Sequence, residues 1–465
     1  WMGKNHETIW INCRGRVLSD PEDGSPRYLV GCINEIGAKQ KADNVSGLLG
    51  EYSLKIFYES RSPKLPQGFL LRIGIDDFKN INESHGNEYG DYILRRTAQC
   101  IEENIGPEQS LFHIVADEFA VVDFSGGSVQ QAEDLFHEIK KSIYAFIEQN
   151  QYKAVYTVSG GIVKNGDVDN SFENAMKLSE FALSEAKERG KNSCYVFEEE
   201  EYEDYLKSRT LLRQLHHAVN NGFEGFEAYF QPLVNAANGE LTGAETLLRF
   251  HSPEGGMVSP GEFIPILEES GLIIPVGRWV LRQALDACRE WQKILPEFKV
   301  NVNLSYVQVL KSRVLTDVRR IVDEFGVKPS SVCIELTESG YLEENERFDK
   351  VWNGLKEYGV LLALDDFGTG YSNLRCLSDL KPAYIKIDRS FTLKALNREY
   401  EYRLLNHIVE MSHSLGLHVC VEGIETEGEL TKAKQTEPDY IQGFLFGKPC
   451  SRAEFTQKFF TKQAG

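Results

Sequence analysis

The chain has 465 residues and a mass of 52.8 kDa, a length that predicts about three folded units, or two of which one is large. Hydrophobic residues make up 42% of the chain and charged residues 26%, which excludes a disordered or low-complexity protein. Its 70 acidic residues outnumber the 51 basic ones, for a formal charge of −19. This charge repels polyanions and excludes a stable complex with a nucleic-acid polymer, whereas a small phosphate ligand stays compatible if metal ions or local basic groups offset it.

The pattern of apolar residues and cysteines favours a cytoplasmic location for this fragment. The longest apolar run, around Gly271–Leu281, contains Pro275 and Arg278, and it falls short of the roughly 20 residues that a membrane helix needs. The nine cysteines are scattered and never form a C-x-x-C pair, which is typical of reduced thiols. The chain starts at Trp1-Met2 without a signal-peptide pattern, so we expect it to be a fragment of a longer protein. The full-length protein could be attached to a membrane.

The N-terminal segment predicts a β-hairpin. Its two strands, Trp10–Leu18 and Arg27–Ile33, flank a turn rich in Asp, Gly and Pro. Such a hairpin is too small to be stable alone. It resembles the last two strands of a PAS sensor domain whose remainder precedes residue 1. We therefore assign residues 1–40 to a C-terminal PAS remnant and linker.

In the next region, residues 41–198, strands alternate with helices, which predicts an α+β domain. The expected elements are a strand at Phe69–Ile75, a helix at Asn87–Asn104, a hairpin over Leu111–Phe124 and a helix at Glu173–Glu188. The acidic run Glu198–Glu201 and the helical sequence after it mark a boundary. We place a helical linker at residues 199–213.

Eight strand-like segments follow residue 225, and helix-length sequences separate them from the second onward. The segments are Phe226–Val234, Leu241–Phe250, Phe298–Leu304, Val332–Leu336, Val360–Asp365, Tyr384–Ile387, His418–Val421 and Tyr440–Leu445. This pattern predicts a closed (β/α)8 barrel of the TIM type over residues 214–465. Because only Asn235–Glu240 joins the first two strands, and a parallel crossover needs about a dozen residues, we expect the first strand to run antiparallel to the second.

Polar side chains stand near the ends of the expected barrel strands. They are Glu245, Asn303, Glu335, Asp365, Asp366, Lys386, Glu422 and Gln442. The carboxyl ends of barrel strands meet on one face, where active sites lie. Four or more carboxylates brought together there would destabilise the fold unless divalent cations lie among them. Oxygen ligands favour Mg²⁺ or Mn²⁺ over zinc.

Seven short segments, in matching order over the C-terminal half, resemble the EAL family of cyclic di-GMP phosphodiesterases. They are Tyr229–Pro232, Glu245–Arg249, Asn303–Ser305, Glu335–Glu338, Asp365–Ser372, Lys386–Asp388 and Glu422–Glu425. The resemblance implies hydrolysis of cyclic di-GMP to 5′-pGpG with two Mg²⁺ or Mn²⁺ ions per site. Such ions activate a water and stabilise the attacking and leaving oxygens of an in-line displacement. The resemblance also implies a homodimer formed through this domain.

The same resemblance implies a role for each matching residue. The metal ligands would be Glu245, Asn303, Glu335, Asp365, Asp366 and Glu422. The substrate would be bound by Gln231, Arg249, Asn303 and Gln442. The catalytic set would be Glu245, Glu338, Asp365, Asp366, Lys386 and Glu422. In it Lys386 would hold the attacking water, Glu422 would be a ligand or general base, and Glu338 would anchor the loop after Asp366. The family's alanine is replaced by Thr246, which flanks a ligand but is not one.

The preceding domain resembles a GGDEF diguanylate cyclase domain that has lost residues its reaction needs. Val115-Ala116 replaces the glycine pair before Asp117, although those glycines allow a tight hairpin and close approach of a triphosphate. Gly74 replaces an aspartate that ligates the metal, and losing it weakens the hold on Mg²⁺. The segment Gly106–Gln109 lacks the inhibitory Arg-x-x-Asp motif. We therefore expect no cyclase activity.

Five residues nevertheless match positions at which the GGDEF family contacts GTP. They are Asn82, Asp91, Asp117, Lys187 and Lys191. One interpretation is a residual scaffold in which Asn82 and Asp91 cap helices, and the other is a regulatory domain that binds GTP without turnover. For the EAL-like domain, the alternative to an enzyme is a non-catalytic cyclic di-GMP receptor. The complete set of ligand positions favours the enzyme.

Overall fold

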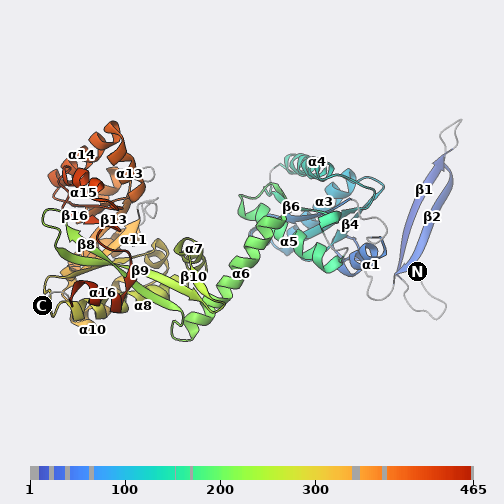
Figure 1. Cartoon of the computed structure of the whole chain (residues 1–465). Coiled ribbons are helices and arrows are strands. Elements are labelled where there is room, and N and C mark those ends of the chain that lie inside the picture. The colour runs from blue at the N-terminus through green and yellow to red at the C-terminus, as the bar shows by residue number, and fades with distance from the viewer. Residues whose placement is uncertain are drawn as a thin grey trace. The chain divides into compact units, whose positions relative to one another are not determined.

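The computed structural model describes residues 42–61, 68–151, 153–167, 171–337, 346–368 and 374–461, together with two strands before them. Those strands, β1 (Trp10–Ser19) and β2 (Pro26–Ile36), pair antiparallel and confirm the expected hairpin, while the PAS assignment stays a prediction. Contacts divide the chain into two compact units, Trp1–Tyr205 and Leu206–Gly465, which Figure 1 shows. No helix within the described ranges has both the length and the apolar character that crossing a membrane requires.

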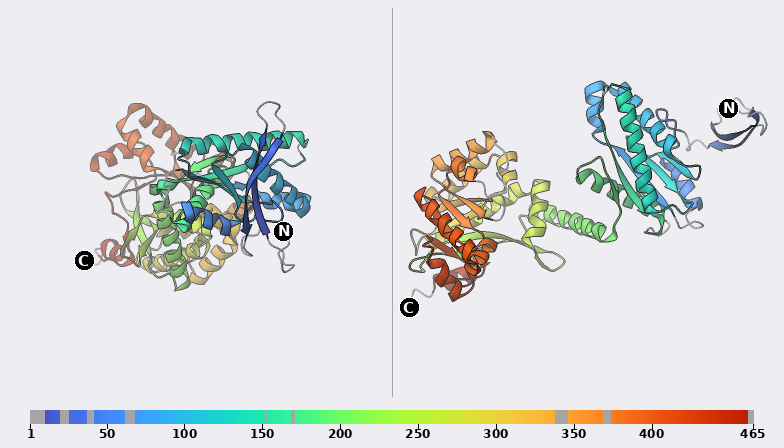
Figure 2. Two further views of the ribbon diagram at one scale, coloured as in Figure 1. Left: turned by 90° about the vertical axis from the view of Figure 1, so that its right-hand side faces the viewer. Right: turned by 90° about the horizontal axis from the view of Figure 1, so that it is seen from above.

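The N-terminal unit is built on a five-stranded sheet in the order β4-β5-β3-β6-β7. Its strands are β3 (Phe69–Ile75), β4 (Gln109–His113), β5 (Glu118–Asp123), β6 (Val158–Lys164) and β7 (Cys194–Val196). Its helices are α1 (Glu51–Arg61), α2 (Phe78–His85), α3 (Asn87–Asn104), α4 (Val129–Gln149) and α5 (Phe172–Glu188), with a 3₁₀ turn at Asn165–Asp167. Because side chains alternate along a strand, Leu71 and Ile73 of β3 pack towards α3 and α4, and Leu70 packs towards α1 and α5. Figure 2 gives two further views of these strands and helices.

A single helix, α6 (Glu199–Asn220), contains the segment expected as a linker. Near its start, Tyr202 packs against the core of the N-terminal unit. Near its end, Leu215 and Ala218 are buried in the core of the C-terminal unit. The helix therefore extends beyond residue 213, because its last turns carry apolar side chains that belong to the second core.

The C-terminal unit contains the expected closed barrel. Its eight strands are β8 (Phe226–Asn235), β9 (Leu241–Ser252), β11 (Lys299–Asn303), β12 (Val332–Thr337), β13 (Leu361–Phe367), β14 (Tyr384–Ile387), β15 (His418–Val421) and β16 (Tyr440–Gln442). Strand β8 closes the barrel by pairing antiparallel with both β9 and β16, and the other neighbouring pairs are parallel. The antiparallel first strand predicted from the short β8–β9 connection is thus confirmed. The short strands β10 (Gly256–Val258) and β17 (Cys450–Ser451) extend the sheet.

Helices surround this barrel and cover its apolar outer surface (Figure 1). They are α7 (Pro260–Ser270), α8 (Ile273–Trp291), α9 (Tyr306–Lys311), α10 (Val314–Phe325), α11 (Glu346–Tyr358), α12 (Leu374–Leu380), α13 (Arg389–Asn397), α14 (Glu399–Ser414), α15 (Glu427–Lys434) and α16 (Arg452–Phe459), with a 3₁₀ turn at Pro329–Ser331. Strand residues such as Val300 and Ile334 are buried in one core with helix residues such as Leu285 and Val318. The parallel strands direct their carboxyl ends to one face of the barrel.

Candidate active site

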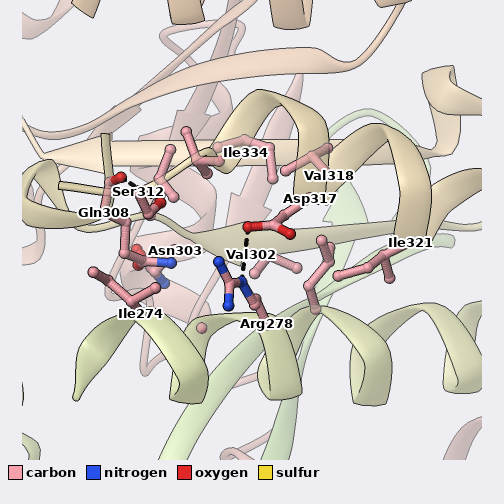
Figure 3. A pocket seen from close by; sticks show the side chains of 14 residues that line it. Ile274, Arg278, Val302, Asn303, Gln308, Ser312, Asp317, Val318, Ile321 and Ile334 are labelled. Carbon is pink, nitrogen blue, oxygen red and sulfur yellow. Dashed lines mark hydrogen bonds and ion pairs between the residues drawn. The ribbon is translucent and has the colours of Figure 1, made fainter. Parts of the chain in front are cut away.

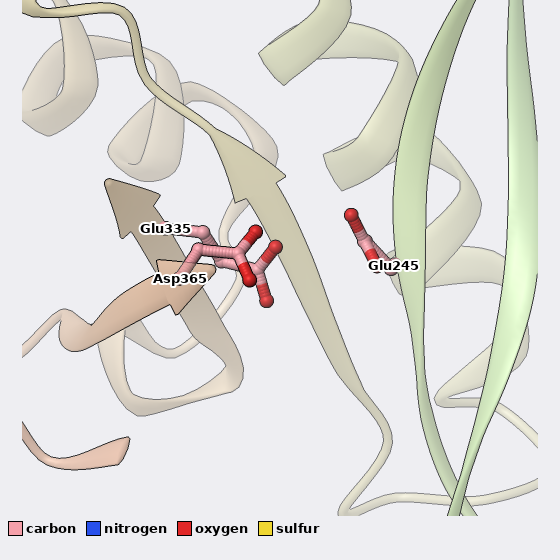
Figure 4. Close-up of side chains that lie close together, drawn as sticks. All are labelled: Glu245, Glu335 and Asp365. Atoms are coloured by element: carbon pink, nitrogen blue, oxygen red, sulfur yellow. The ribbon is translucent and has the colours of Figure 1, made fainter. Parts of the chain in front are cut away.

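A cluster of buried carboxylates lies inside the barrel. One side-chain oxygen from each of Glu245 on β9, Glu335 on β12 and Asp365 on β13 lies within 4.8 Å of the others. Figure 4 shows Glu335 and Asp365 on neighbouring strands, and Glu245 on β9, which β11 separates from β12 in the sheet. All three are buried, and Glu335 has no exposed surface. Because these residues are distant in sequence, closure of the barrel creates the cluster.

Lys386 on β14 is the cation among these carboxylates. Its Nζ lies 3.2 Å from Glu245 Oε2, 2.9 Å from Glu335 Oε2, 3.3 Å from Asp365 Oδ2 and 2.8 Å from Glu422 Oε1. Burial opposes the charged form of this lysine, which is 1% exposed. The surrounding carboxylates nevertheless raise the pKa of Lys386 well above its usual value. The ammonium is therefore charged, and one positive charge faces four acidic groups.

The carboxyl groups of the cluster differ in their tendency to ionise. Burial, reinforced by neighbouring carboxylates, raises the pKa of Glu335 well above its usual value, and it raises the pKa of Glu422 to about 8 although Lys386 opposes the shift. Burial also opposes ionisation of Glu245, but Lys386 and two hydrogen-bond donors lower the pKa of Glu245 below its usual value. Glu245 is therefore the carboxylate that stays ionised. In Glu335 and Glu422, burial and the negative charge of the neighbouring carboxylates disfavour the ionised form.

Side-chain amides hold Glu245 in place. Asn303 Nδ2 donates to Glu245 Oε1 at 3.0 Å, and Gln442 Nε2 donates to Glu245 Oε2 at 2.6 Å. The same Gln442 Nε2 lies 3.1 Å from Gln231 Oε1, to which it also donates. The structure thus brings together three of the amide residues that the sequence singled out. Gln442 Oε1 is buried and accepts no hydrogen bond from any described residue.

Asn301 is a site residue that the sequence analysis missed. Its Nδ2 donates to Glu335 Oε1 at 2.6 Å, and both side chains are buried. Since Lys386 donates to the other oxygen of Glu335, the two contacts fix this carboxylate. The available signal was the period of the strand, because residues two apart on β11 face the same side and Asn303 was already a candidate metal ligand.

Asp366 follows Asp365 at an irregular point of β13. The pairing of β13 with β14 shifts register between Leu364 and Phe367, and Asp366 has a φ of 57° in the left-handed region. Its backbone N–H donates to Asp365 Oδ1 at 2.9 Å. Burial, followed by the neighbouring Asp365 charge, raises the pKa of Asp366 to about 6. Bulges and strained residues of this kind are common beside active sites, where they redirect side chains.

The residues of this cluster fit a divalent cation. The candidate donors are carboxylate oxygens and the buried amide oxygen of Gln442, which has no partner among the described residues. Such an oxygen set suits Mg²⁺ or Mn²⁺. The negative charge in excess of Lys386 gives a physical reason for a cation. Within the described ranges, no other group of three acidic, histidine or cysteine residues meets the same geometry.

An open cavity of about 550 Å³ adjoins the carboxylate cluster and shares Asn303 with it. Thr246, Arg249, Glu268 and Ser305 contribute polar groups to its wall, and Ser305 Oγ donates to Glu268 Oε1 at 2.6 Å. Burial lowers the pKa of Arg249 from its usual value. The volume lies in the range of small-molecule binding sites. The link between the two is Asn303, which lines the cavity and donates to Glu245.

A second cavity, whose lining residues Figure 3 shows with Asn303 among them, is much smaller at about 20 Å³. Arg278 on α8 and Asp317 on α10 form an ion pair at its edge, with Nε 2.7 Å from Oδ2. Such a volume holds about one water molecule. The larger cavity is therefore the candidate for a substrate.

Some expected site residues lie elsewhere or outside the description. Glu338 belongs to residues 338–345, which lie outside the described residues, as do residues 369–373 of the loop after Asp366. In the N-terminal unit, Asn82 and Asp91 occupy interior positions of α2 and α3, whose N-cap residues are Asp77 and Gly86. The expectation that they cap helices is therefore wrong, because the chain turns between the two helices at Gly86, with a φ of 84°.

The remaining candidates for nucleotide binding surround the carboxyl end of β3. Asp117 lies in the β4–β5 turn, Lys187 on α5, and Lys191 just after α5. Lys191 Nζ lies 2.8 and 2.7 Å from the two carboxylate oxygens of Asp77. Burial raises the pKa of Asp117, and the charge of Lys187 opposes this shift. Lys191 therefore has an acidic partner, and Lys187 is near enough to Asp117 to favour its charged form.

Comparison with known proteins identifies both units. The family model of the EAL domain matches residues 212–449, and that of the diguanylate cyclase GGDEF domain matches residues 53–193. The cyclic di-GMP phosphodiesterase PdeR of Escherichia coli is 29% identical over 455 residues, which are 97% of this chain and 67% of PdeR. The bifunctional diguanylate cyclase/cyclic di-GMP phosphodiesterase MucR of Pseudomonas aeruginosa is 29% identical over 381 residues, which are 82% of this chain and 55% of MucR.

A solved structure shows the same barrel. The PaMucR phosphodiesterase in complex with c-di-GMP is 32% identical, with a TM-score of 0.50, and the match covers 53% of this chain and 99% of that one. This chain spans about half the length of the curated relatives it matches, with 49%, 50% and 55% of three of them covered.

Proposed function

Because this chain belongs to the EAL family of cyclic di-GMP phosphodiesterases, with a GGDEF domain before its EAL domain, we propose that it hydrolyses cyclic di-GMP to 5′-pGpG with Mg²⁺ or Mn²⁺. The observation that carries the proposal is the buried cluster of Glu245, Glu335 and Asp365 around Lys386, beside a cavity containing Arg249. A receptor that only binds the dinucleotide has no need to bury so many carboxylates, because their mutual repulsion destabilises the fold.

The proposed ligands of two ions share oxygen donors and a place at the carboxyl ends of the strands. They are Glu245, Asn303, Glu335, Asp365, Asp366 and Glu422. When bound, such ions supply an activated water and stabilise negative charge on the attacking and leaving oxygens. Asn303 and Gln442 orient Glu245 through their hydrogen bonds. Asn301 orients Glu335 in the same way.

Glu422 and Lys386 have proposed roles in the reaction itself: one concerns the proton of the attacking water, and the other concerns the charge of the phosphate. Glu422 is the proposed acceptor of the proton of the attacking water, because its carboxylate faces the cluster with Oε1 2.8 Å from Lys386 Nζ. Lys386 offsets the charge of the phosphate or holds that water. Glu338 keeps its proposed role as an anchor of the loop after Asp366.

The cavity beside the cluster is the proposed site of the dinucleotide. Arg249 binds the phosphate that is not cleaved, because a guanidinium offers paired donors to phosphate oxygens. Gln231 and Gln442 are the polar side chains that we propose to contact the substrate near the phosphate that is cleaved. The PaMucR structure, a complex with c-di-GMP, supports the choice of substrate.

The test is incubation of the purified chain with cyclic di-GMP and Mg²⁺ or Mn²⁺, followed by chromatography of the products. We expect 5′-pGpG from the native chain and a loss of turnover by orders of magnitude in Glu245→Gln, which removes the ligand charge but keeps the side-chain shape. The exposed Glu262→Gln on α7 is the matched control and should keep full turnover. Binding without any product in the native chain would favour the receptor, and full turnover in Glu245→Gln would contradict the proposed site.

For the GGDEF domain we propose that it makes no cyclic di-GMP and that it regulates the barrel by binding GTP. Asn82 and Asp91 support guanine recognition, because both are half-buried on adjacent helices and offer hydrogen-bonding groups to the base. Asp117, Lys187 and Lys191 complete the proposed site. Calorimetric titration with GTP and ATP, repeated on Asp91→Ala, tests this: preference for GTP that the variant loses supports it, and equal heats for both nucleotides contradict it.

The family and the sequence support a proposal for the oligomeric state, the location and the domain context of the full-length protein. We propose a cytoplasmic homodimer formed through the EAL domain, with a PAS sensor upstream in the full-length protein. The mass of the purified chain in solution, measured by light scattering, tests the dimer.

A further inference from the structure

The ring of His113, at the end of β4, connects two segments of the GGDEF domain. Its Nδ1 lies 3.2 Å from Asp43 Oδ1, in the segment before α1. Its Nε2 lies 2.9 Å from the carbonyl oxygen of Ala116, in the β4–β5 turn. His113 is 8% exposed, and its ring stacks on Phe119 of β5 with the ring centroids 5.1 Å apart. Both ring nitrogens therefore face an oxygen of the chain, at a place where water has little access.

Asp43 is a fixed acceptor for this ring. Its Oδ1 accepts from the backbone N–H of Val45 at 3.0 Å, from the backbone N–H of Ser46 at 2.7 Å and from Ser46 Oγ at 2.8 Å. Burial opposes ionisation of Asp43, but hydrogen bonds from Ser46 and the charge of His113 lower the pKa of Asp43 below its usual value. The carboxyl group is therefore ionised and has no proton to donate to the ring.

The two oxygens that face His113 decide how many protons its ring needs. A carboxylate and a carbonyl oxygen both accept hydrogen bonds, and only a doubly protonated imidazolium has an N–H for each of them. A neutral ring has one N–H, which the carbonyl oxygen of Ala116 takes, because Asp43 keeps its backbone donors. The lone pair of Nδ1 then faces the Asp43 carboxylate. Ser46 Oγ, 3.2 Å from Nδ1, satisfies this lone pair only by turning away from Asp43.

Other charged side chains on the neighbouring elements contact partners of their own. These pairs are Arg95 with the carbonyl oxygen of Val45, Glu118 with Arg72, and Lys55 with Glu173. In the turn, the charge of Lys187 acts on Asp117. Within the part of the chain that the structure describes, the ionised side chain in contact with the ring is Asp43.

We propose that His113 is a proton-dependent latch between the segment Asp43–Ser46 and the β4–β5 turn. With two protons the ring holds both, and with one proton it holds the turn and releases the segment. Histidine is the side chain that changes its charge between about pH 5 and 8, so acidification closes the latch. The latch depends neither on GTP binding to this domain nor on hydrolysis in the barrel.

Three substitutions separate the latch from the fold of the domain. His113→Gln keeps one donor and one acceptor in a planar group and cannot gain a proton. Asp43→Asn removes the charge that favours the imidazolium and keeps an oxygen for the backbone N–H groups of Val45 and Ser46. The matched control is His137→Gln, which removes an exposed histidine of the same domain, on α4.

The direct test is NMR spectroscopy of the full chain labelled with ¹⁵N-histidine, in which the His113 signals are those that His113→Gln lacks. We expect protons on both ring nitrogens at about pH 5.5 and on Nε2 alone at about pH 8. In Asp43→Asn the change should occur at a lower pH, because an amide attracts the imidazolium less than a carboxylate does. A ring with the same number of protons across this range, or an unchanged transition in Asp43→Asn, overturns the proposal.

A second measurement reports on the segment itself. Hydrogen exchange of peptides covering residues 42–49, corrected for the pH dependence of intrinsic exchange and followed by mass spectrometry, compares the native chain with His113→Gln. The native chain should be about 2- to 10-fold more protected near about pH 5.5, the range that one net hydrogen bond provides, and equally protected near about pH 8. His137→Gln should match the native chain at both pH values. A ratio between the native chain and His113→Gln that does not change with pH contradicts the latch.

Discussion

Replacing Lys386 by methionine removes the positive charge from the carboxylate cluster and keeps an unbranched side chain of similar length. Without metal, four acidic groups at 2.8–3.3 Å from Nζ lose their cation. Removing one partner of a buried ion pair costs about 3–5 kcal/mol of folding free energy. Because Lys386 is 1% exposed, water cannot replace its charge, and we expect a loss within this range at a pH where the carboxyls ionise.

The size of this loss should depend on pH. The folded-state pKa of Glu422 is raised to about 8 by burial, and that of Glu335 is also raised. A carboxyl with a raised pKa takes up a proton on folding, so the folded state binds more protons between about pH 4.5 and 8 and the free energy of unfolding falls as pH rises. Protonated carboxyls need no counter-ion. The effect of Lys386→Met should therefore be smaller near about pH 5, where Glu245 is the main ionised partner of Lys386, and largest near about pH 8.5.

The assay is urea unfolding followed by tryptophan fluorescence, in EDTA and in excess Mg²⁺. The barrel contains Trp279, Trp291 and Trp352, and residues 41–198 contain no tryptophan. Of the two domains only the barrel therefore contributes tryptophan fluorescence, in addition to the signal of Trp1 and Trp10 in the N-terminal segment. A cation present at about 100 times its Kd adds about 2.7 kcal/mol, and it should recover much of the loss.

The matched control for Lys386→Met is Lys350→Met on α11, whose side chain is 79% exposed. This variant should change the free energy of unfolding by less than about 0.5 kcal/mol. If Lys386→Met unfolds at the same urea concentration as the native chain in EDTA at about pH 8.5, the role assigned to this charge is wrong.

Three further predictions concern the metal, the orientation of its ligands and the cyclase reaction. Excess EDTA should abolish hydrolysis and Mg²⁺ should restore it, whereas Ca²⁺ should restore little because its bonds are longer and its geometry looser; full activity in EDTA would exclude a metal-dependent reaction. Asn301→Ala should weaken Mn²⁺ binding by about 10-fold or more, because it frees Glu335 to rotate, and unchanged affinity in a Mn²⁺ titration would refute that role. In a Glu245→Ala background, where product would survive, GTP with Mg²⁺ should yield no cyclic di-GMP by chromatography, and its accumulation would show that Gly74 and Val115-Ala116 tolerate the reaction.

The sequence predicts most of the barrel because its signals are local. Strand length, apolar runs and the short segment Asn235–Glu240 are enough to predict eight strands and an antiparallel first strand. The last strand is an exception: β16 ends at Gln442 instead of Leu445. A Cβ at Gly443 would lie 2.0 Å from the Ile424 carbonyl oxygen, so the chain there approaches a neighbouring loop and leaves the sheet. Such an approach depends on tertiary packing, which the sequence pattern does not contain.

The candidate site was predicted in its composition but not in its contacts. The strand-end positions of Glu335 and Lys386 follow from the period of each strand. That Lys386 contacts four carboxylates depends on the closure and register of the barrel, because the strands that carry them are distant in sequence. Asn301 was missed for the same reason: its partner Glu335 is on the neighbouring strand. In the GGDEF domain a Cβ added to Gly74 on β3 would lie 2.9 Å from Lys187 Nζ on α5, and no local pattern predicts this approach of a helix side chain to a strand.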